Sequence, residues 1–510
     1  MATRKVTHPS VDDRKAMGSA ARDRVPLSGH TKWSPAADRP DPVALLVEQD
    51  ETRVPDLVPV RHGRMMVSPF TFYRGAAKVM AADLATTPVA GLEAQLCGDA
   101  HLSNFGMFAS PERRLLFDVN DFDETLTGPF EYDVKRMAAS FTIAARNNGF
   151  SQADAGAATT ASVRAYREAM AGFAPMTVMD IWYASLDEDE LQASIRTIVA
   201  GTAGQEKAAR SAEKTDKRAK APKKAEKQAA KQAKAGSQQE KEAKAIQKQE
   251  AKTVAKAHSR DSLQALSKLG EVVDGTFRIV SQPPVVVPLR DLLSAYGLSA
   301  EETGHSIREE FRAYRETLQD DRRLLLERFE FVDVARKVVG VGSVGTEAFI
   351  VLLQGRDAQD PLFLQVKEAT ASVLEPYVRK SRYRQHGERV VQGQRLMQAA
   401  SDIYLGWSKS LNTRRHFYWR QLRDMKGSVD VGTMTPLTLT YYAHLCGWTL
   451  ARAHARSGDP VAIATYLGGS GAFDESITDF AERYADQNEQ DYQEFVNAVQ
   501  SGRLAATEGV

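Results

Sequence analysis

The sequence contains very little cysteine and no long apolar run, and its charges almost cancel. Cys97 and Cys446 are its only cysteines, which excludes a disulfide framework and a cysteine-ligated zinc site. Because no stretch of about 18 apolar residues occurs, nothing is expected to span a bilayer. Lysine and arginine number 67 and acidic residues 66, so the whole chain is not a polyelectrolyte built for nucleic acid.

The composition that remains is that of a globular protein. Among 510 residues, 43% are hydrophobic and 26% are charged, which is enough to bury a large core. At roughly 100–200 residues a domain, this length predicts several domains or lobes. The first 26 residues carry basic side chains but no apolar core, so we expect no secretory signal and a cytoplasmic protein without membrane contact.

One segment, residues 205–257, differs from the rest of the chain. It is made almost wholly of Ala, Lys, Gln and Glu, with 14 Lys and 2 Arg against 7 acidic residues. These residues favour helix, but no large apolar stripe is present, so we expect a flexible or solvated helical insertion. The alternative is an electrostatic tether with weak contact to nucleic acid or an acidic partner, since clustered lysines bind phosphate backbones without sequence choice.

The pattern of apolar residues divides the chain into four regions. Residues 1–40 are polar and form an arm that is either mobile or wrapped on the surface. Residues 41–330 are mainly helical and predict a large lobe that also holds the motifs at 98–123. Residues 331–428 predict a small lobe of five strands, and residues 429–510 predict helices that pack back on the large lobe.

Three glycines, Gly340, Gly342 and Gly345, form the pattern G-x-G-x-x-G. In a dinucleotide-binding fold the third glycine opens a helix, but here the following residues, TEAFIVLLQG, are typical of a strand. A glycine loop between two strands is the arrangement that covers the ATP phosphates in protein-kinase-like folds. A plain glycine hairpin is the alternative.

A lysine on the next strand strengthens this interpretation. Lys367 lies in FLQVKEA, among apolar residues, and lysine is rarely buried unless it is paired. Its position matches the phosphate-pairing lysine of the kinase signature, which needs an acidic partner on the following helix. Glu388 is the first choice for that partner and Glu375 the second. Alternatively, Lys367 is a surface residue of an edge strand.

A polar motif much earlier in the chain, at residues 98–104, reads G-D-x-H-x-x-N. It resembles the catalytic loop of the aminoglycoside-phosphotransferase and choline-kinase branch of the kinase-like superfamily. The resemblance implies that Asp99 accepts the proton of a substrate hydroxyl and that Asn104 is a magnesium ligand. His101 is either a further donor near the site or a satisfied core histidine.

A second acidic run follows at residues 118–123. Asp121-Phe122-Asp123 resembles the metal-binding Asp-Phe-Gly position, with aspartate in place of glycine. Asp121 is the expected Mg²⁺ ligand, Asp123 belongs to the same set and Asp118 is its rival, because Mg²⁺ takes one or two carboxylates besides phosphates and waters. Such clusters also simply make turns. Asp133 is expected to accept backbone hydrogen bonds from the catalytic loop.

The motifs occur in an unusual order. In ordinary kinase-like proteins the glycine-rich lobe precedes the catalytic loop, whereas here it follows it. Residues 434–454 resemble the helix that normally runs directly into that loop. We therefore predict an α+β, two-lobed, protein-kinase-like fold that is circularly permuted, with residues 434–454 packed beside residues 93–104.

The wider sequence resembles the bacterial family called domain of unknown function 2252. The resemblance extends from about residue 20 to 500, apart from the lysine-rich segment, and implies no particular activity. The motifs that carry it are VPVRHGRMMVSPFTFYRGAA, CGDAHLSNFG, FDVNDFDET, DVKRMAAS, VVGVGSVGT, LQVKEA, RQLRDMKG and LARAHARSGD.

From the motifs we predict an ATP- and Mg²⁺-dependent phosphotransferase that acts on a hydroxyl of a small-molecule or protein acceptor. The stretch RQLRDMKG, residues 420–427, is expected to form a hinge that holds adenine. Arg74 and Arg136 flank the site and either bind an anionic acceptor or are structural. Two alternatives stay open on the same fold: nucleotidyl (AMP) transfer, and a catalytically inactive nucleotide-binding regulatory protein. A metallophosphatase is disfavoured because its further histidine-rich elements are missing.

Overall fold

The structure is a computed structural model that leaves several segments of the chain undescribed. The predicted insertion lies largely outside the described residues, although Val254 and Ala257 near its end pack against the core and so extend the folded part back into it. The described residues are 8–191, 262–273, 276–296, 299–338, 340–410, 413–422, 425–427 and 429–509, with single positions at 248, 251, 252, 254, 255, 257 and 259.

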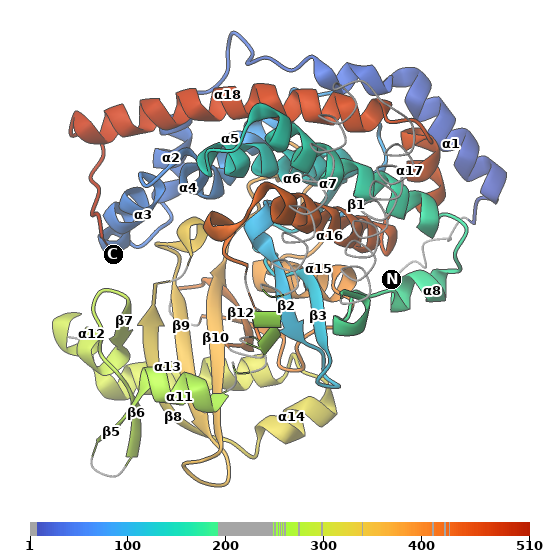
Figure 1. Cartoon of the computed structure of the whole chain (residues 1–510). Helices are drawn as coiled ribbons and strands as arrows, with labels where there is room; N and C mark the ends of the chain where they lie inside the picture. The colour runs from blue at the N-terminus through green and yellow to red at the C-terminus, as the bar shows by residue number, and fades with distance from the viewer. Residues whose placement is uncertain are drawn as a thin grey trace, which may run out of the picture.

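Both ends of the chain build a helical half, residues 8–191 and 429–509, which occupies the upper part of Figure 1. It also holds two short antiparallel strand pairs, β1 with β4 and β2 with β3, and in Figure 1 β2 and β3 extend downward from it. Its elements are α1 (Val11–Arg24), α2 (Pro42–Asp50), α3 (Val58–Met65), α4 (Pro69–Gly75), α5 (Ala77–Leu84), β1 (Glu93–Leu96), β2 (Phe105–Ala109), β3 (Leu115–Val119), β4 (Leu126–Pro129), α6 (Phe130–Asn147), α7 (Gln152–Phe173), α8 (Val178–Tyr183), α16 (Pro436–Ala455), α17 (Pro460–Leu467) and α18 (Ala472–Gln500).

The middle of the chain builds a sheet half, residues 262–422, around a six-stranded antiparallel sheet of order β11-β12-β10-β9-β8-β7. In Figure 1 it lies below the helical half. Its elements are α11 (Ser262–Leu269), β5 (Gly270–Val273), β6 (Thr276–Ile279), β7 (Val286–Pro288), α12 (Leu289–Tyr296), α13 (Ala300–Arg315), α14 (Asp320–Leu326), β8 (Glu330–Lys337), β9 (Ala348–Gln354), β10 (Pro361–Ala369), α15 (His386–Met397), β11 (Gly406–Lys409) and β12 (His416–Gln421).

This arrangement confirms an α+β protein and corrects the predicted boundary at residue 330. The five predicted strands are present, but β7 adds a sixth at the edge beside β8. The helices before residue 330 cover the sheet: Tyr314 of α13 packs with Leu364 and Trp419 on one face, and Leu266 of α11 packs with Phe363 on the other. Helical periodicity predicts an apolar face but not what that face covers, so the sequence assigned these helices to the wrong half.

The polar N-terminal region wraps the surface, one of its two predicted alternatives. Helix α1 begins with a capping box at Ser10 and packs against α17. Beyond it, the His30 ring nitrogen Nε2 lies 2.7 Å from the Tyr466 hydroxyl, and the Trp33 ring packs on Phe480 and Tyr484 of α18. These buried aromatic contacts fix the arm to the C-terminal helices.

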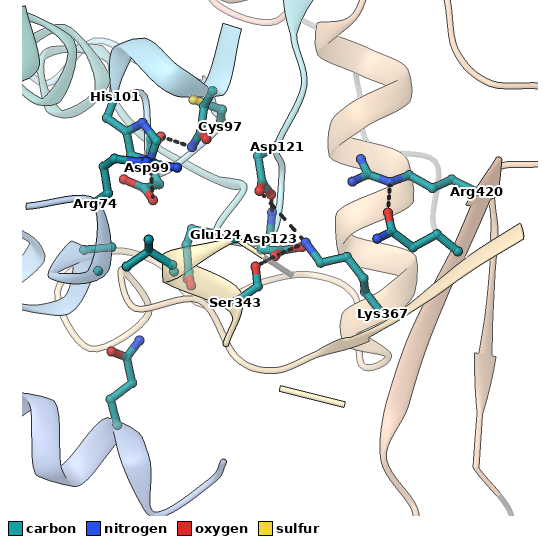
Figure 2. Close-up of a pocket in the computed structure, with 18 residues that line it drawn as sticks. Arg74, Cys97, Asp99, His101, Asp121, Asp123, Glu124, Ser343, Lys367 and Arg420 are labelled. Carbon is teal, nitrogen blue, oxygen red and sulfur yellow. Dashed lines mark hydrogen bonds and ion pairs between the residues drawn. The ribbon is translucent and has the colours of Figure 1, made fainter. Parts of the chain in front are cut away.

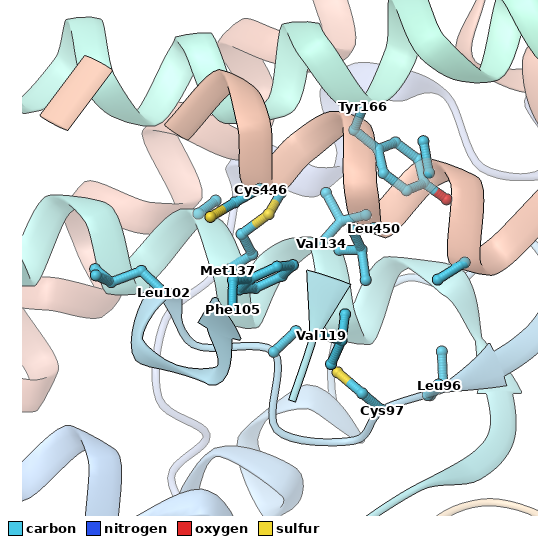
Figure 3. Packing of buried hydrophobic residues seen from close by; sticks show 14 of the residues in the cluster. Leu96, Cys97, Leu102, Phe105, Val119, Val134, Met137, Tyr166, Cys446 and Leu450 are labelled. Atoms are coloured by element: carbon cyan, nitrogen blue, oxygen red, sulfur yellow. The ribbon is translucent and has the colours of Figure 1, made fainter. Parts of the chain in front are cut away.

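The largest hydrophobic core lies directly beneath the loop that follows β1 (Figure 3). In Figure 3, Val134 and Met137 of α6 meet Cys446 and Leu450 of α16 there, and Leu102 of the loop lies beside them. Helix α16 therefore packs beside the residues that were predicted to form the catalytic loop, as expected for residues 434–454. None of the helices in the described ranges is both long and apolar enough to cross a membrane.

Candidate active site

A polar cavity of about 270 Å³ lies between the helical half and the sheet half. Figure 2 shows side chains from both halves that point into it. Seven residues predicted as catalytic, nucleotide-binding or metal-binding meet here: Asp99, Asn104, Asp121, Asp123, Gly340, Gly342 and Lys367. The other lining residues are Gln49, Arg74, Gly75, Ala77, Cys97, His101, Glu124, Val341, Ser343, Gln365 and Arg420.

The centre of the cavity is an ion pair between the two halves. The Lys367 Nζ lies 2.6 Å from Asp123 Oδ2 and 3.9 Å from Asp121 Oδ2. Asp123 also accepts hydrogen bonds from the Tyr418 hydroxyl at 2.6 Å and from Ser343 Oγ at 3.2 Å. Lys367 is only 3% exposed and lies on β10, an inner strand of the sheet, which excludes the alternative of a surface lysine on an edge strand.

The partner of this lysine differs from the prediction. The carboxylates that pair with Lys367 among the described residues are Asp121 and Asp123, and not Glu388 or Glu375. Glu388 lies in the first turn of α15, where its backbone N–H donates to Gln385 Oε1. Its neighbour Arg389 turns toward the site instead and donates to three backbone oxygens, those of Asp123, Thr125 and Thr370.

Burial and mutual repulsion give the two aspartates different pKa values. Burial, reinforced by the charge of Asp123, raises the pKa of Asp121 above its usual value. Burial acts in the same direction on Asp123, but the Lys367 ammonium and its hydrogen bond outweigh it and lower the pKa of Asp123. Glu124 next to them has its pKa raised to about 7, chiefly by burial. The carboxylates of Asp121, Asp123 and Glu124 together therefore carry more negative charge than the single ammonium of Lys367 neutralises.

The predicted catalytic loop presents Asp99 to the cavity. Asp99 Oδ1 accepts a hydrogen bond from Arg136 Nε at 2.7 Å, while its Oδ2 lies 3.8 Å from His101 Nε2. The Arg136 guanidinium is held in turn by the backbone oxygen of Tyr73 at 2.8 Å and stacks on the Tyr73 ring. Of the two roles predicted for Arg136, the structure therefore supports the structural one, because its donors are already used within the protein.

Two further contacts fix the shape of this loop. Asn104 Nδ2 donates to the Asp99 backbone oxygen at 2.7 Å. The other atom of this amide, its oxygen, can therefore serve as a ligand for a cation. Asp133 accepts the backbone N–H groups of Cys97 at 2.8 Å and Gly98 at 3.1 Å, as predicted. Gly98 has a φ of +84°, and a Cβ there would collide with the Glu124 backbone oxygen, so glycine is required.

Asp118 is not in the cavity, which corrects its prediction as a rival metal ligand. Its side chain is fully buried, forms an ion pair with Arg452 of α16 and accepts the Ala399 backbone N–H at 2.8 Å. In a strand, alternate residues point to opposite faces, so Asp118 at the end of β3 faces the core whereas the loop after β3 carries Asp121 outward. Spacing alone could not distinguish the two.

The glycine loop joins β8 to β9, as the sequence predicts, and it is fastened to the helical half. The side chain of Arg53 donates to the Gly342 backbone oxygen at 3.0 Å and also to that of Val344. The Val54 N–H donates to the Gly345 oxygen at 2.7 Å. Gly345 has a φ of +90° and packs on the Arg53 side chain. Nothing in the pattern around Arg53 pointed to this role.

The predicted hinge is only partly described, and one of its backbone sites is already occupied. Residues 423 and 424 of this stretch lie outside the described ranges. The Gly427 N–H and carbonyl both pair with Met107 of β2, at 2.9 and 2.8 Å, so they are not open to an adenine ring. Arg420 at the start of this stretch instead donates to Gln365 Oε1 at 3.0 Å and lines the cavity.

Tyr418 is a site residue that the sequence analysis missed, and Arg420 was expected in the hinge and not beside Lys367, although a signal for both exists. In the register of the sheet, Lys367 lies opposite Tyr418 and Gln365 lies opposite Arg420. Side chains two positions apart share a face, so these four form one polar patch on an otherwise apolar sheet. In the β12 sequence Phe-Tyr-Trp-Arg, every second residue lies on the same face. This alternation could have shown that Tyr418 and Arg420 share one face of the sheet with Lys367.

The residues present fit a magnesium ion bound together with phosphates. Within the described ranges, no three His, Cys, Asp or Glu side chains form a ready-made metal cage. Mg²⁺ does not need one, since it commonly takes one or two carboxylates and completes its octahedron with phosphate and water oxygens. Asp121, with a side chain 34% exposed, and the Asn104 amide oxygen are suitable donors in the cavity.

Fold and site together define an α+β protein with a charged interdomain cavity, built by an antiparallel sheet and a set of helices drawn from both ends of the chain. The chain belongs to the family described as "Uncharacterized protein conserved in bacteria (DUF2252)", whose model matches residues 53–237 and 220–498. The two matched segments overlap within the lysine-rich region. Neither the curated proteins nor the solved structures contain a match to this chain.

Proposed function

We propose that this protein is an ATP- and Mg²⁺-dependent phosphotransferase with a circularly permuted protein-kinase-like fold. The observation that carries the proposal is the meeting of Lys367 with Asp121 and Asp123 in one cavity that also contains Asp99 and the glycine loop. A buried lysine on the strand after a glycine hairpin, opposite an aspartate that follows a strand, is the arrangement that kinase-like enzymes use for nucleotide phosphates.

The packing of α16 supports the permuted order. In an unpermuted chain this helix would lead directly into the catalytic loop. Here its C-terminal residue His454 places Nε2 at 3.2 Å from Asp133, the residue that holds the loop backbone, and the Tyr442 hydroxyl donates to the Leu102 oxygen at 2.8 Å. The helix and the loop are thus neighbours in space although they are more than 300 residues apart.

In the proposed reaction, the acceptor hydroxyl oxygen forms a bond to the γ-phosphorus of ATP and the bond from that phosphorus to the β–γ bridging oxygen breaks. The products are ADP and a phosphate monoester, and the hydroxyl proton passes to Asp99. Asp99 suits this role because Arg136 holds its Oδ1, which leaves Oδ2 as the oxygen that faces the cavity. A positioned base of this kind contributes about 10²- to 10⁴-fold.

The sheet side of the cavity would receive the phosphates. Lys367 and Arg420 supply positive charge there, and Gly340 and Gly342 allow the backbone to approach because no Cβ stands in the way. Asp121 and Asn104 would hold Mg²⁺, which neutralises charge on the transferred phosphate when it is bound. Glu388 is not part of the cavity in this conformation.

Titration of the full chain with ATP tests the proposal. We expect ATP with Mg²⁺ to raise the melting temperature, ATP without Mg²⁺ to raise it less, and Lys367→Met to abolish most of the shift, because a ligand that binds only the folded state stabilises it. The exposed Arg356→Gln is the matched control for loss of one cation, since Arg356 is 80% exposed in the turn between β9 and β10. The absence of any shift with ATP and Mg²⁺ would contradict the proposal.

Product analysis then separates the activities that remain open. Release of ADP supports phosphoryl transfer, and release of pyrophosphate supports AMP transfer instead. Nucleotide binding with neither product, over a panel of hydroxyl acceptors and with water alone, supports a regulatory protein that binds ATP without turnover.

A further inference from the structure

One cation in the cavity has no hydrogen-bond or ion-pair partner within the described part of the protein, although its guanidinium lies 5.9 Å from the centre of the Phe70 ring. Arg74, at the end of α4, lines the cavity, yet no hydrogen bond or ion pair joins it to another described residue, and its Nε is buried without an acceptor. Two other arginines of the helical half each have an acidic partner: Arg136 pairs with Asp99 and Arg61 with Asp50. Arg74 is half-buried, and a buried N–H group without an acceptor is costly, so the unpaired Nε points to a ligand.

Two neighbours of Arg74 also present polar groups without a partner. His101 is 4% exposed and lines the cavity, and its Nδ1 has no partner in the described residues. Helix α5 begins at Ala77, which lines the same wall, and no side chain caps its first turn. An uncapped helix N-terminus beside a guanidinium attracts anions, because its free backbone N–H groups carry partial positive charge.

The charges are distributed unevenly along the cavity. In Figure 2, Arg74, Asp99 and His101 lie together at one end, Lys367 and Arg420 at the other, and Asp121 and Asp123 between them. At the first end Arg136 already neutralises Asp99, so Arg74 leaves a positive charge uncompensated. Burial also lowers the pKa of Arg74, which shows that the nearby Asp99 does not fully offset its desolvation.

We propose that Arg74, with His101 and the first turn of α5, forms an oxyanion subsite for the acceptor, so that the acceptor is a small alcohol carrying a phosphate or carboxylate group. The assignment to the acceptor rests on the proposed phosphotransferase function, whereas the binding of an anion at Arg74 does not. With the anion at Arg74, the hydroxyl of such a molecule reaches Asp99, and the cavity of about 270 Å³ limits its size. Arg74 would act here as a binding residue that sets specificity.

The experiment measures anion binding to the full chain without nucleotide, by calorimetry at pH 7.5 in a low-salt buffer. The probes are inorganic phosphate and, separately, glycolate, so that the two arms distinguish a phosphate from a carboxylate. Four variants are compared with the wild type: Arg74→Gln, Arg74→Lys, Lys367→Met and the exposed control Arg356→Gln.

We expect at least one probe to bind the wild type, with a dissociation constant that rises about 10-fold or more in Arg74→Gln, because a charge-assisted hydrogen bond is lost. Arg74→Lys keeps the charge but not the fork of donors, so it should lose only part of the affinity. Arg356→Gln should change the dissociation constant less than twofold, and Lys367→Met should raise it less than Arg74→Gln does. Since no hydrogen-bond or ion-pair partner of Arg74 would be left unsatisfied, and the contact with the Phe70 ring is at 5.9 Å, its variants should stay close to the melting temperature of the wild type.

Three outcomes would overturn the subsite. They are the absence of binding of both probes to the wild type, a loss of binding in Lys367→Met but not in Arg74→Gln, and equal binding to all variants. If ATP binds in a Lys367-dependent manner while one of these outcomes holds, only the acceptor inference fails. If the anion binds through Arg74 but ATP does not bind at all, the anion site is confirmed and the phosphotransferase proposal fails.

Discussion

Lys367 Nζ and Asp123 Oδ2 lie 2.6 Å apart, although 244 positions separate the two residues in the chain. The contact joins β10, an inner strand of the sheet, to the loop that follows β3, and it lies at the centre of the cavity. Around it, Tyr418 and Ser343 add two hydrogen bonds to the same carboxylate, so Asp123 is the point at which the sheet, the glycine loop and the helical half meet.

This pair predicts a measurable coupling. Lys367→Met should lower the free energy of unfolding by about 1–3 kcal/mol, because two carboxylates lose the cation that neutralises them. The loss is moderate because the side chain of Asp123 is partly exposed to solvent. In a double-mutant cycle with Asp123→Asn, we expect the double variant to lose at least about 0.5 kcal/mol less than the sum of the single variants. Urea denaturation measures all four proteins. Additive losses would show that the pair carries no coupling energy.

Asp99→Asn should separate catalysis from nucleotide binding. The amide keeps an oxygen for Arg136 Nε, so the loop is expected to stay in place, but it cannot take a proton. Turnover of ATP with a working acceptor should fall about 10²- to 10⁴-fold, while the thermal shift with ATP and Mg²⁺ stays close to that of the wild type. The exposed Asp357→Asn is the matched control. Unchanged turnover in Asp99→Asn would remove Asp99 from the mechanism.

Asp118 and Asp121 should give opposite results, although they lie three residues apart. Asp118→Asn weakens the buried ion pair with Arg452, so we expect a loss of stability of about 3 kcal/mol without a change in the Mg²⁺ concentration that activity requires. Asp121→Asn should preserve or raise stability, because it removes a carboxylate that Asp123 repels, and should raise the required Mg²⁺ concentration. If Asp118→Asn, and not Asp121→Asn, raised the Mg²⁺ concentration that activity requires, the assignment of Asp121 as the Mg²⁺ ligand would be wrong.

Glu124 gives a prediction for pH. Burial raises its pKa from 4.5 to about 7, so between these values the folded protein holds a proton that the unfolded chain has released. The contribution of Glu124 to stability is therefore most favourable below about pH 4.5 and declines as the pH rises toward 7, by on the order of 2–3 kcal/mol in total. Glu124→Gln should remove this decline while its side-chain oxygen still accepts the Val373 N–H.

The measurement is the free energy of unfolding of wild type and Glu124→Gln from pH 4.5 to 8, taken as a difference so that other titrating groups cancel. The variant should gain on the wild type as the pH rises. A constant difference over the whole range would show that Glu124 has an ordinary pKa.

Local signals in the sequence predicted most strands and helices and many of the cavity residues. The glycine loop between two strands, the apolar strand around Lys367 and the polar loop at Asp99 each have a pattern that a few neighbouring residues determine. The sequence also predicted that residues 434–454 pack beside 93–104, because the end of that helix is typical of the element that precedes such a loop. These features depend on short stretches, which is why sequence reasoning reaches them.

The partner of each charged group could not be predicted in the same way. Glu388 was expected to hold Lys367, but Asp123 does so, because the choice depends on how far the loop after β3 reaches across the cavity. Asp118 and Asp121 have the same chemistry and differ only in the direction of their side chains. Arg53 lies about 290 residues from the glycine loop that it holds, and only the packing of α3 and its flanking turn against that loop brings them together.

The core beneath the loop that carries Asp99 has a consequence for how the chain is made. Helix α16 supplies Cys446 and Leu450 to that core and Arg452 to Asp118, so the first half of the polypeptide emerges from the ribosome with a gap where α16 will lie. At about 5–20 residues per second, roughly 15 to 70 seconds pass between the synthesis of Asp118 and that of Arg452. During that interval the part of the core that α16 covers in the folded protein lacks that helix.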